Sequence, residues 1–414
     1  MAEDFFTLDD FDTAGKTVLL RVDINSPIDP GSGRLLNDAR LREHLATIRD
    51  LKRAKVALLA HQSRPGKDDY TTLEPHADRL SYLLGTRVRY VDSLFGASAL
   101  DAIRGMAPGE IVLLENTRFF AEEEALADAK PEKMAKTHIV RRLASVADYF
   151  CLDAFAAAHR AQPTLCGFAE VLPTMAGRVL QRELEMLDRA VRSSERPKLA
   201  VFGGIKIDDS ISVTQHMLAA GVVDRVLTVG GVAIAFLQAQ GLDPGKPTVE
   251  FMRKEIEGYD ALVEQCRLLL AKFPGKIEVP SDIVVNDGGR RHGMRVKELP
   301  SPHQVADIGL DTIVRFADEI AAARTVFLNG PAGIFEIEEF STGTRELFRA
   351  VADSEAFTVV GGGHTVAAVE QYGLQDKIDH VSTGGGALIN YLAAKPLPLV
   401  DALKRSRRKF PKAS

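Results

Sequence analysis

The sequence is poor in tryptophan, cysteine and long apolar segments. Its 414 residues include no tryptophan and three cysteines, Cys151, Cys166 and Cys266, and no apolar stretch is long enough to span a bilayer. An odd number of cysteines without the spacing of metal ligands predicts reduced core residues in a reducing compartment. The acidic N-terminus, MAEDFFTLDDFD, lacks the basic and then apolar pattern of a secretion signal. We therefore expect a cytoplasmic protein that does not associate with membranes.

Positive charge is not in excess either. Lys and Arg number 52 against 57 Asp and Glu, which gives a formal net charge of −5. This balance argues against a nucleic-acid partner, and we interpret the basic C-terminal stretch DALKRSRRKF as a helix end packed on a domain. Hydrophobic residues make up 45% and charged residues 26%, as in globular proteins. The length favours two domains of similar size.

Two common nucleotide-binding signatures are missing. The segment GLDPGKP has the wrong spacing for a Walker A loop and lacks the following Ser or Thr. No GxGxxG fingerprint with a downstream ribose-binding acid occurs either. A nucleotide site in this chain must therefore be built from other turns.

The first half of the chain alternates short apolar runs with amphipathic segments. The predicted strands cover residues 17–25, 55–60, 88–91, 110–115 and 149–155. A helix is predicted over 38–54, with Asn37 or Asp38 as its cap. The acidic stretch 121–136 predicts a solvated helix and loop, and residues 179–191 predict an interdomain helix. The alternation predicts an α/β fold with parallel sheets covered on both faces.

Polar and basic residues stand where these strands end. Because the carboxyl ends of parallel strands meet at one edge, we expect their side chains to share a pocket. The residues are Arg21, Asp23, Asn25, Arg40, His61, Ser63, Arg64, Glu115, Asn116, Arg118, Asp153, His159 and Arg160. Five arginines there would form an anion site with bidentate geometry for phosphate and carboxylate. Any one arginine is more often a surface ion-pair partner, and His61 and His159 fit structural roles as well as ligand contacts.

The second half changes from arginine to glycine at the ends of its strands. FGGIK (202–206), VGGVA (229–233), NGPAG (329–333) and VGGGH (360–364) each follow an apolar run, and STGGGA (382–387) adds another glycine turn. Such turns can form a floor of backbone donors for a polyphosphate. Lys206, directly after the first turn, is a movable point charge suited to phosphate, although a single glycine turn with a solvated lysine would be unremarkable.

The ordered set of motifs resembles the phosphoglycerate kinase family over nearly the whole chain. RVDINSP, HQSRP, LLENTRF and DAFAAAHR are similar to its N-terminal motifs, and GGIK, NGPAGIFE, GGGHT and STGGGA are similar to its nucleotide-domain motifs. The resemblance implies two doubly wound, Rossmann-like α/β domains. A phosphoglycerate-binding domain would cover 1–175 plus 398–414, an interdomain helix and hinge 176–192, and a nucleotide-binding domain 193–397.

The resemblance also implies an activity. It implies reversible phosphoryl transfer between 1,3-bisphosphoglycerate and ADP, which gives 3-phosphoglycerate and ATP with Mg²⁺, in glycolysis and gluconeogenesis. We expect a monomer whose domains close on their ligands to keep the reactive donor from water. Positioning and charge neutralisation would dominate catalysis, because an acyl phosphate needs little acid–base help.

Motif matches assign the site residue by residue. The phosphoglycerate would be held by Asp23, Asn25, Arg40, His61, Ser63, Arg64, Arg118 and Arg160. The nucleotide would be held by Gly204, Lys206, Gly230, Asn329, Pro331, Gly333, Glu336, Gly361, Gly362, Gly363, His364 and Thr365, with Glu336 on the ribose. Lys206, against the transferring phosphoryl group, and Arg40 are the expected catalytic residues.

Two positions depart from the usual family pattern and resemble its archaeal branch. Ser210 stands where most members have a second lysine, and His364 stands where they have a metal-holding aspartate. The protein ligand of Mg²⁺ therefore stays open. We expect nucleotide oxygens and water to hold the metal, with His364 contacting a phosphate or a water. Asp208 or Asp209 could supply a carboxylate, although helix capping is the commoner role for either.

Two other kinds of protein remain as alternatives at this stage. A two-domain dehydrogenase would be expected to carry the missing dinucleotide fingerprint. A non-catalytic two-domain protein that binds small anions or nucleotides would not need Lys206 among its glycine turns.

Overall fold

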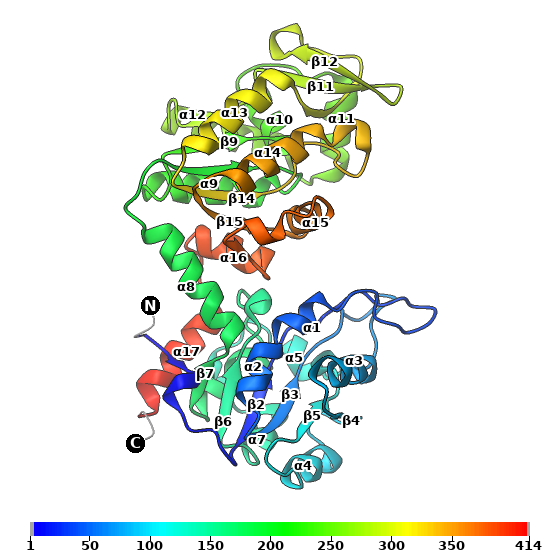
Figure 1. Ribbon diagram of the computed structural model, residues 1–414, viewed down its shortest axis with the longest axis vertical. Helices are drawn as coiled ribbons and strands as arrows, with labels where there is room; N and C mark the ends of the chain where they lie inside the picture. Colours follow the sequence, from blue (N-terminus) through cyan, green and yellow to red (C-terminus); the bar gives the residue numbers. More distant parts are fainter. Residues whose placement is uncertain (1–3, 412–414) are drawn as a thin grey trace. The chain divides into compact units, whose positions relative to one another are not determined.

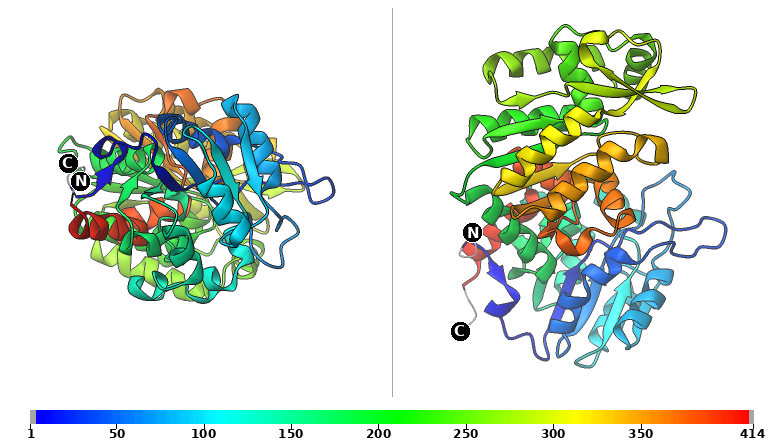
Figure 2. Two further views of the ribbon diagram at one scale, coloured as in Figure 1. Left: turned by 90° about the horizontal axis from the view of Figure 1, so that it is seen from below. Right: turned by 45° about the horizontal axis from the view of Figure 1, so that its top comes forward.

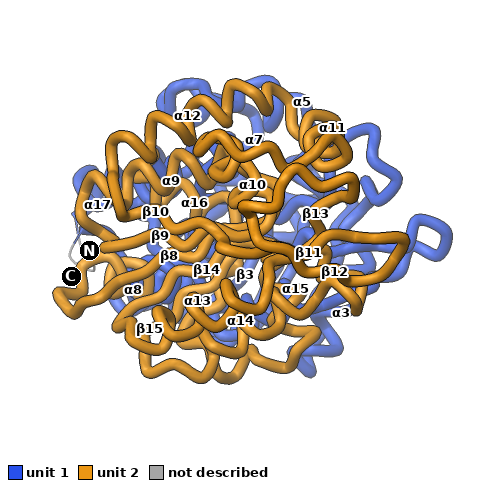
Figure 3. Tube along the Cα trace, turned by 90° about the horizontal axis from the view of Figure 1, so that it is seen from above, with its two compact units in different colours: residues 1–185, 396–414 blue, residues 186–395 orange. Residues whose placement is uncertain are grey.

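The computed structural model describes residues 4–411, and the chain divides into two compact units (Figures 1 and 3). One unit contains residues 1–185 and 396–414, and the other contains residues 186–395. The division falls inside α8 (Arg178–Arg192), the segment that the sequence predicts as the interdomain helix. Residues 1–3 and 412–414 of the predicted first domain lie outside the described residues. No helix in the described part of the chain combines the length and apolar character of a membrane span.

The first unit is built on a parallel sheet of seven strands in the order β1-β7-β6-β2-β3-β5-β4. The strands are β1 (Phe6–Thr7), β2 (Thr17–Arg21), β3 (Lys55–Leu59), β4 (Val88–Val91), β5 (Ile111–Leu114), β6 (Tyr149–Leu152) and β7 (Thr174–Ala176). The chain runs from β2 to β3, then to the edge strand β4 and back to β5 between β3 and β4, before it continues with β6 on the other side of β2. Ligands of open α/β sheets bind at such a reversal, beyond the carboxyl ends of the strands.

Helices cover both faces of this sheet (Figure 1). They are α1 (Ala39–Glu43), α2 (Leu45–Asp50), α3 (Glu74–Leu84), α4 (Ala97–Arg104), α5 (Ala121–Ala125), α6 (Pro131–Met134), α7 (His138–Ala144), α8 and α17 (Pro398–Lys409). Val18 and Leu20 of β2 pack in one core with Leu41 and Leu45, whereas Leu19 is buried on the opposite face. Strands buried on both faces read as continuous apolar runs, which is why the sequence reveals them.

The helix predicted over 38–54 is interrupted at His44. The His44 side chain leaves the helix surface to contact Asp153 and the backbone of Asp23, so that two short helices replace one. Asp38 occupies the N-cap position, as one of the two predicted alternatives, but its side chain makes no capping hydrogen bond and pairs with Arg42 instead. Asn37, one residue earlier, accepts a hydrogen bond from the Ala39 amide.

The prediction of a solvated helix and loop over the acidic stretch 121–136 is wrong for one of its glutamates. The stretch contains α5 and α6 as predicted helical segments, but it is not fully solvated, because Glu123 has no exposed surface. Glu123 accepts hydrogen bonds from the backbone amide and the hydroxyl of Thr164. In a run of three glutamates, the sequence does not indicate which side chain is buried.

The second unit contains a six-stranded parallel sheet in the order β10-β9-β8-β14-β15-β16. Its strands are β8 (Lys198–Phe202), β9 (Arg225–Thr228), β10 (Ile277–Glu278), β14 (Thr325–Asn329), β15 (Phe357–Gly361) and β16 (His380–Val381). Its helices are α9 (Ile207–Ala219), α10 (Gly230–Ala239), α11 (Lys246–Glu255), α12 (Tyr259–Lys272), α13 (Leu310–Ala322), α14 (Thr342–Asp353), α15 (Gly363–Gln371) and α16 (Gly385–Leu392). The chain reverses between β8 and β14, so the predicted fold of two doubly wound parallel sheets is confirmed.

A three-stranded antiparallel sheet adds to the second unit. It pairs β11 (Asp282–Asp287) with β12 (Arg290–Arg295) and β13 (Gln304–Ile308). Gly288 and Gly289 form the hairpin turn, and both have the positive φ that two-residue hairpin turns require. The alternation of strands and helices does not predict this element.

The two ends of the described chain lie side by side in the first unit (Figure 2). The Arg407 guanidinium of α17 lies 4.9 Å from the ring centroid of Phe6, and Ser406 accepts a hydrogen bond from the Thr174 amide of β7. The basic C-terminal helix therefore packs on its own domain. The three cysteines are buried and unpaired, as predicted.

Candidate active site

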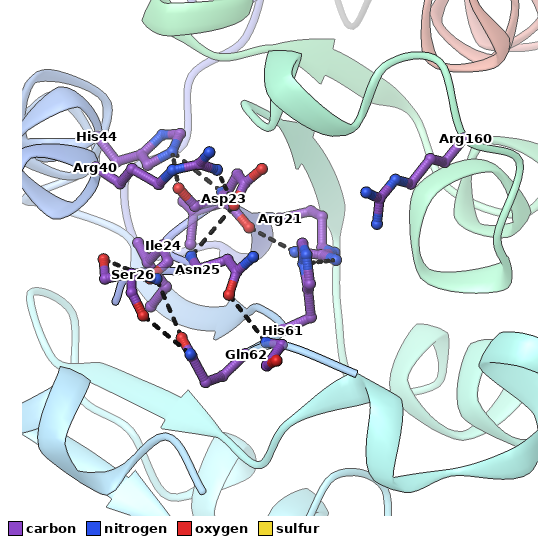
Figure 4. Close-up of polar contacts among 12 residues, drawn as sticks. Arg21, Asp23, Ile24, Asn25, Ser26, Arg40, His44, His61, Gln62 and Arg160 are labelled. Carbon is purple, nitrogen blue, oxygen red and sulfur yellow. Dashed lines mark hydrogen bonds and ion pairs between the residues drawn. The ribbon is translucent and has the colours of Figure 1, made fainter. Parts of the chain in front are cut away.

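A cluster of polar side chains stands at the carboxyl end of the first sheet, beside the reversal between β2 and β6 (Figure 4). Arg40 of α1 pairs with Asp23 at 3.0 Å between Nη1 and Oδ1. The Asn25 amide donates to Asp23, and the Ser63 amide donates to the Asn25 side chain at 2.9 Å. Arg118 donates to the Ser63 carbonyl. Segments after β2, β3 and β5 are thus connected into one surface.

Positive charge dominates this surface. Arg21 is 1% exposed, and burial lowers the pKa of its guanidinium to about 10, with Arg118 and Arg160 contributing further. Burial and the neighbouring Arg160 also lower the pKa of Arg118. In Figure 4 the Arg160 side chain extends toward the side on which Arg21 lies, and Arg160 forms no ion pair with a carboxylate of the described residues. Arginines that depress one another's pKa favour a bound anion.

His61 and Asp23 differ in charge near pH 7, because the imidazole is neutral and the carboxyl is ionised. Burial lowers the pKa of the His61 imidazole well below its usual value, so the ring is neutral near pH 7. Burial alone would raise the pKa of the Asp23 carboxyl, but the neighbouring His61, Arg40 and Arg21 hold it well below its usual value. Asp23 therefore remains ionised and orients Arg40.

Arg64 differs from the other predicted anion ligands. Its side chain is exposed and makes no hydrogen bond or ion pair with the part of the chain that the structure describes. The position after β3 leaves it free to reach a ligand, but the protein itself does not orient it.

The second unit presents a cavity of about 240 Å³ beside the reversal between β8 and β14. Its walls are largely apolar, with Ile234, Leu237, Met252, Val305, Ile308 and Ile334. Six of the predicted nucleotide ligands line it, namely Gly204, Gly230, Pro331, Gly333, Glu336 and His364. An apolar cavity with a few polar groups at its edge suits a flat base attached to a charged tail.

Close contacts between four strand-end turns, those after β8, β9, β14 and β15, form the floor of this cavity. The Gly204 amide donates to the Pro331 carbonyl at 2.9 Å, and the Gly330 amide donates to Thr365 Oγ1 at 2.7 Å. Gly330 has φ 96°, and a Cβ there would stand 2.1 Å from the Gly203 carbonyl. Gly230 has φ 56°, and a Cβ there would stand 2.6 Å from the Pro331 carbonyl. The turns can pack this closely because these positions lack a side chain.

The remaining predicted nucleotide ligands are not among the residues that line this cavity. Asn329 and Gly361 end the neighbouring strands β14 and β15, and Gly362 and Gly363 begin α15. Lys206 does not line the cavity; it is exposed at the start of α9.

The first turn of α9 shows whether its acidic residues cap the helix. Lys206 occupies the N-cap position, so Asp208 and Asp209 lie in the first turn and neither caps the helix. Burial and the adjacent Asp208 raise the pKa of the Asp209 carboxyl. Ser210, which stands in place of a second lysine, donates to the Lys206 carbonyl at 3.0 Å and contributes no charge.

Comparison with known proteins decides the family. The family model described as Phosphoglycerate kinase matches residues 8–395. A phosphoglycerate kinase of Thermoplasma acidophilum is 49% identical over 408 residues, which cover 99% of each chain. One from Methanothermobacter thermautotrophicus is 48% identical over 97% of each chain. The crystal structure of the Pyrococcus horikoshii OT3 phosphoglycerate kinase superposes with a TM-score of 0.90 at 42% identity, covering 98% of this chain and 100% of that one.

The chain belongs to the phosphoglycerate kinase family. It is therefore a kinase, and neither the dehydrogenase nor the non-catalytic binding protein is favoured. These relatives are archaeal, in agreement with the resemblance of Ser210 and His364 to the archaeal branch.

Members of the phosphoglycerate kinase family share the motifs that located most of this site, but several supporting residues escaped sequence analysis. His44 Nδ1 lies 2.7 Å from Asp153 Oδ2, and Asp153 Oδ1 accepts hydrogen bonds from the Val179 and Leu180 amides at the start of α8. The signal for His44 was available, since it follows Leu41 by three residues on the buried face of its helix. No comparable signal singles out Glu123 or Thr164.

Asp23→Asn is expected to reduce stability at neutral pH by about 1.5–3 kcal/mol, the range for hydrogen bonds to charged groups. The folded protein depresses the pKa of Asp23 below the usual 3.8, so its ionised form stabilises the fold above that pH. This contribution begins to decline as the pH falls below about 4, where the carboxyl of the unfolded chain takes up a proton, and it is lost completely only below the depressed pKa of the folded state. Urea unfolding at pH 7, 5 and 3.5 measures the difference, which should shrink with acid. A difference that grows toward pH 3.5 would contradict the assignment.

Proposed function

We propose that this chain catalyses reversible phosphoryl transfer between 1,3-bisphosphoglycerate and ADP, which yields 3-phosphoglycerate and ATP. The observation that carries the proposal is the division of chemistry between the two sheets. The first unit has an arginine cluster with excess positive charge at its strand ends, and the second has an apolar cavity floored by glycine turns. The phosphoglycerate would bind to the former and the nucleotide to the latter.

The anionic ends of the phosphoglycerate suit the first cluster. Arg21, Arg118 and Arg160 would neutralise its phosphate and carboxylate oxygens, and Arg40, oriented by Asp23, would face the acyl phosphate. Glu336 is exposed at the edge of the nucleotide cavity, where its carboxylate would accept hydrogen bonds from ribose hydroxyls. The enzyme would act in the cytoplasm as a monomer.

The transfer step requires no proton. A terminal oxygen of the ADP β-phosphate forms a bond to the phosphorus of the acyl phosphate, and the bond between that phosphorus and the carboxyl oxygen breaks. The leaving carboxylate carries the electron pair away as 3-phosphoglycerate. Charge on the phosphoryl oxygens is then the main barrier, which Lys206 and the positive end of α9 would lower.

The chain fits a Mg²⁺ that arrives with the nucleotide. Among the described residues, no group of three His, Cys, Asp or Glu side chains is placed to hold a metal. Mg²⁺ in kinases usually keeps waters and takes one or two carboxylates together with substrate phosphates. His364 and, in the first turn of α9, Asp208 or Asp209 are the residues that could complete its surroundings. The ion would neutralise charge on the nucleotide phosphates.

His364→Ala is expected to leave the Mg²⁺ concentration for half-maximal rate within about twofold of the original protein, because Mg²⁺ prefers oxygen ligands. Asp208→Asn and Asp209→Asn test the carboxylate alternative in the same titration of initial rate against Mg²⁺. A large rise for His364→Ala would show that the imidazole is a ligand.

A coupled assay tests the function directly. Purified protein with ADP and 1,3-bisphosphoglycerate should produce ATP, and with ATP and 3-phosphoglycerate it should produce ADP. Binding of both ligands without product would instead support the non-catalytic alternative. Product formed without any preference for these substrates would contradict the proposal.

A further inference from the structure

The contact between Arg21 and His61 determines which ring nitrogen of the histidine carries hydrogen. Arg21 Nη2 lies 3.1 Å from His61 Nδ1, and both side chains are buried (Figure 4). A guanidinium has N–H donors and no acceptor, so Nδ1 must accept this hydrogen bond. The neutral ring then carries its hydrogen on Nε2. Nε2 makes no hydrogen bond with any described residue, so the Nε2–H donor is available to a ligand.

Three further contacts hold the Arg21 guanidinium in place. Its Nη1 donates to the carbonyls of Val22 and Leu59, and its Nε donates to Thr164 Oγ1 at 3.3 Å. The Thr164 hydroxyl in turn donates its single hydrogen to Glu123 Oε1. Because that hydrogen is committed to the carboxylate, the hydroxyl oxygen is left as an acceptor for Arg21. Glu123 therefore sets the direction of the Thr164 hydroxyl, and Arg21, which can only donate, sets the direction of the bond to His61.

The surroundings of His61 reinforce this arrangement. The charged groups that face the ring are Arg21 and Asp23 from β2 and the residues after it, Arg118 after β5, and Arg160 after β6. Three cations against one anion disfavour a second proton on the ring. Glu123 forms no ion pair with a described residue; it accepts two hydrogen bonds from Thr164, and its negative charge raises the pKa of Arg21.

We infer that Glu123, Thr164 and Arg21 act as positioning residues that fix His61 as a neutral Nε2–H donor to an anionic oxygen of the phosphoglycerate. The inference rests on the proposed function for the identity of the ligand, whereas the state of the ring does not depend on it. His61 thus contributes a directed hydrogen bond rather than a charge, and the arginines contribute the charge.

The tautomer can be observed directly in the full chain labelled with ¹⁵N-histidine. Long-range ¹H–¹⁵N spectra between pH 5.5 and 8 should show His61, assigned by its loss in His61→Gln, with a bare Nδ1 and a protonated Nε2 throughout. Addition of 3-phosphoglycerate should shift the Nε2 resonance more than the Nδ1 resonance. An imidazolium, or hydrogen on Nδ1, in the original protein would overturn the inference even if the enzyme proves active.

Substitutions at Thr164 separate positioning from packing. Thr164→Val removes the hydroxyl at nearly constant volume, and we expect mixed His61 tautomers and a KM for 3-phosphoglycerate raised about tenfold, with the KM for ATP within twofold. Thr164→Ser keeps the hydroxyl and should restore both readouts. Thr325→Val is the matched control, since Thr325 is a buried threonine without a hydroxyl partner at the amino end of β14.

Equal behaviour of Thr164→Val and Thr164→Ser in both readouts would overturn the inference. If Thr164→Val does not fold, Glu123→Gln removes the carboxylate charge and supplies the same comparison. Failure of the proposed function is distinguishable, because a chain without kinase activity would still report the His61 tautomer in the spectra.

Discussion

Replacing Lys206 with methionine is expected to lower kcat about 10²- to 10³-fold, the range for removal of one transition-state donor. Lys206 is exposed at the N-cap of α9 and forms no ion pair with the described residues. Position 210, four residues later, is a serine and supplies no second positive charge. Its positive charge is free to follow the phosphoryl group, whose charge is spread most widely during transfer. ADP binding should change far less, since the glycine turns and the apolar cavity hold the nucleotide.

Steady-state kinetics with ADP and 1,3-bisphosphoglycerate, together with ADP binding by calorimetry, measure both effects. Lys246→Met is a matched control, because Lys246 is an exposed lysine of α11 in the same unit that pairs with Glu250. If Lys206→Met raised the KM for ADP with kcat nearly unchanged, Lys206 would bind the ground state and the assignment would fail.

Replacing Arg160 with alanine is expected to weaken 3-phosphoglycerate binding by about 1.5–3 kcal/mol, or about 10- to 150-fold. Arg160 is half-buried beside Arg21 and Arg118, and the only hydrogen bond of its guanidinium to a described residue is to His159 at 3.5 Å. A guanidinium without a carboxylate partner forms new charge-assisted bonds with a ligand at little cost. ADP affinity should stay within twofold.

Titration calorimetry with each ligand separately checks this expectation. Arg64→Ala should also weaken 3-phosphoglycerate binding selectively, but by less, because the protein does not orient the exposed Arg64 side chain. Arg53→Ala provides the control, since Arg53 is an exposed arginine 3.8 Å from Asp12. Equal losses for 3-phosphoglycerate and ADP on removing Arg160 would show that the site is misassigned.

The positions of most site residues could be predicted because a parallel sheet brings strand ends together. Asp23, His61 and Arg118 are far apart in the sequence, yet each follows an apolar strand by a few residues, and Arg21 ends the first of these strands. Once the strands are recognised, the sheet places these residues at one edge whatever the details of packing. The glycine turns after β8, β14 and β15 meet for the same reason.

The supporting residues Glu123 and Thr164 could not be predicted, because neither lies in a strand or directly after one. Glu123 lies in the short helix α5, and Thr164 lies in the helical segment Pro163–Gly167. Their contact joins residues 41 positions apart. The antiparallel sheet of β11, β12 and β13 was missed as well, because strands that alternate polar and apolar residues give a weaker pattern than buried runs.

By itself the sequence determined the two-unit α/β architecture, the family, and which strand ends carry arginine or glycine. These follow from local periodicity and from short motifs, which act over a few residues. The tertiary structure alone decided which charges are buried, which are paired, and which atoms of His61 and Arg21 meet. Burial and hydrogen-bond direction depend on distances between distant segments, and those distances exist only after the chain has packed.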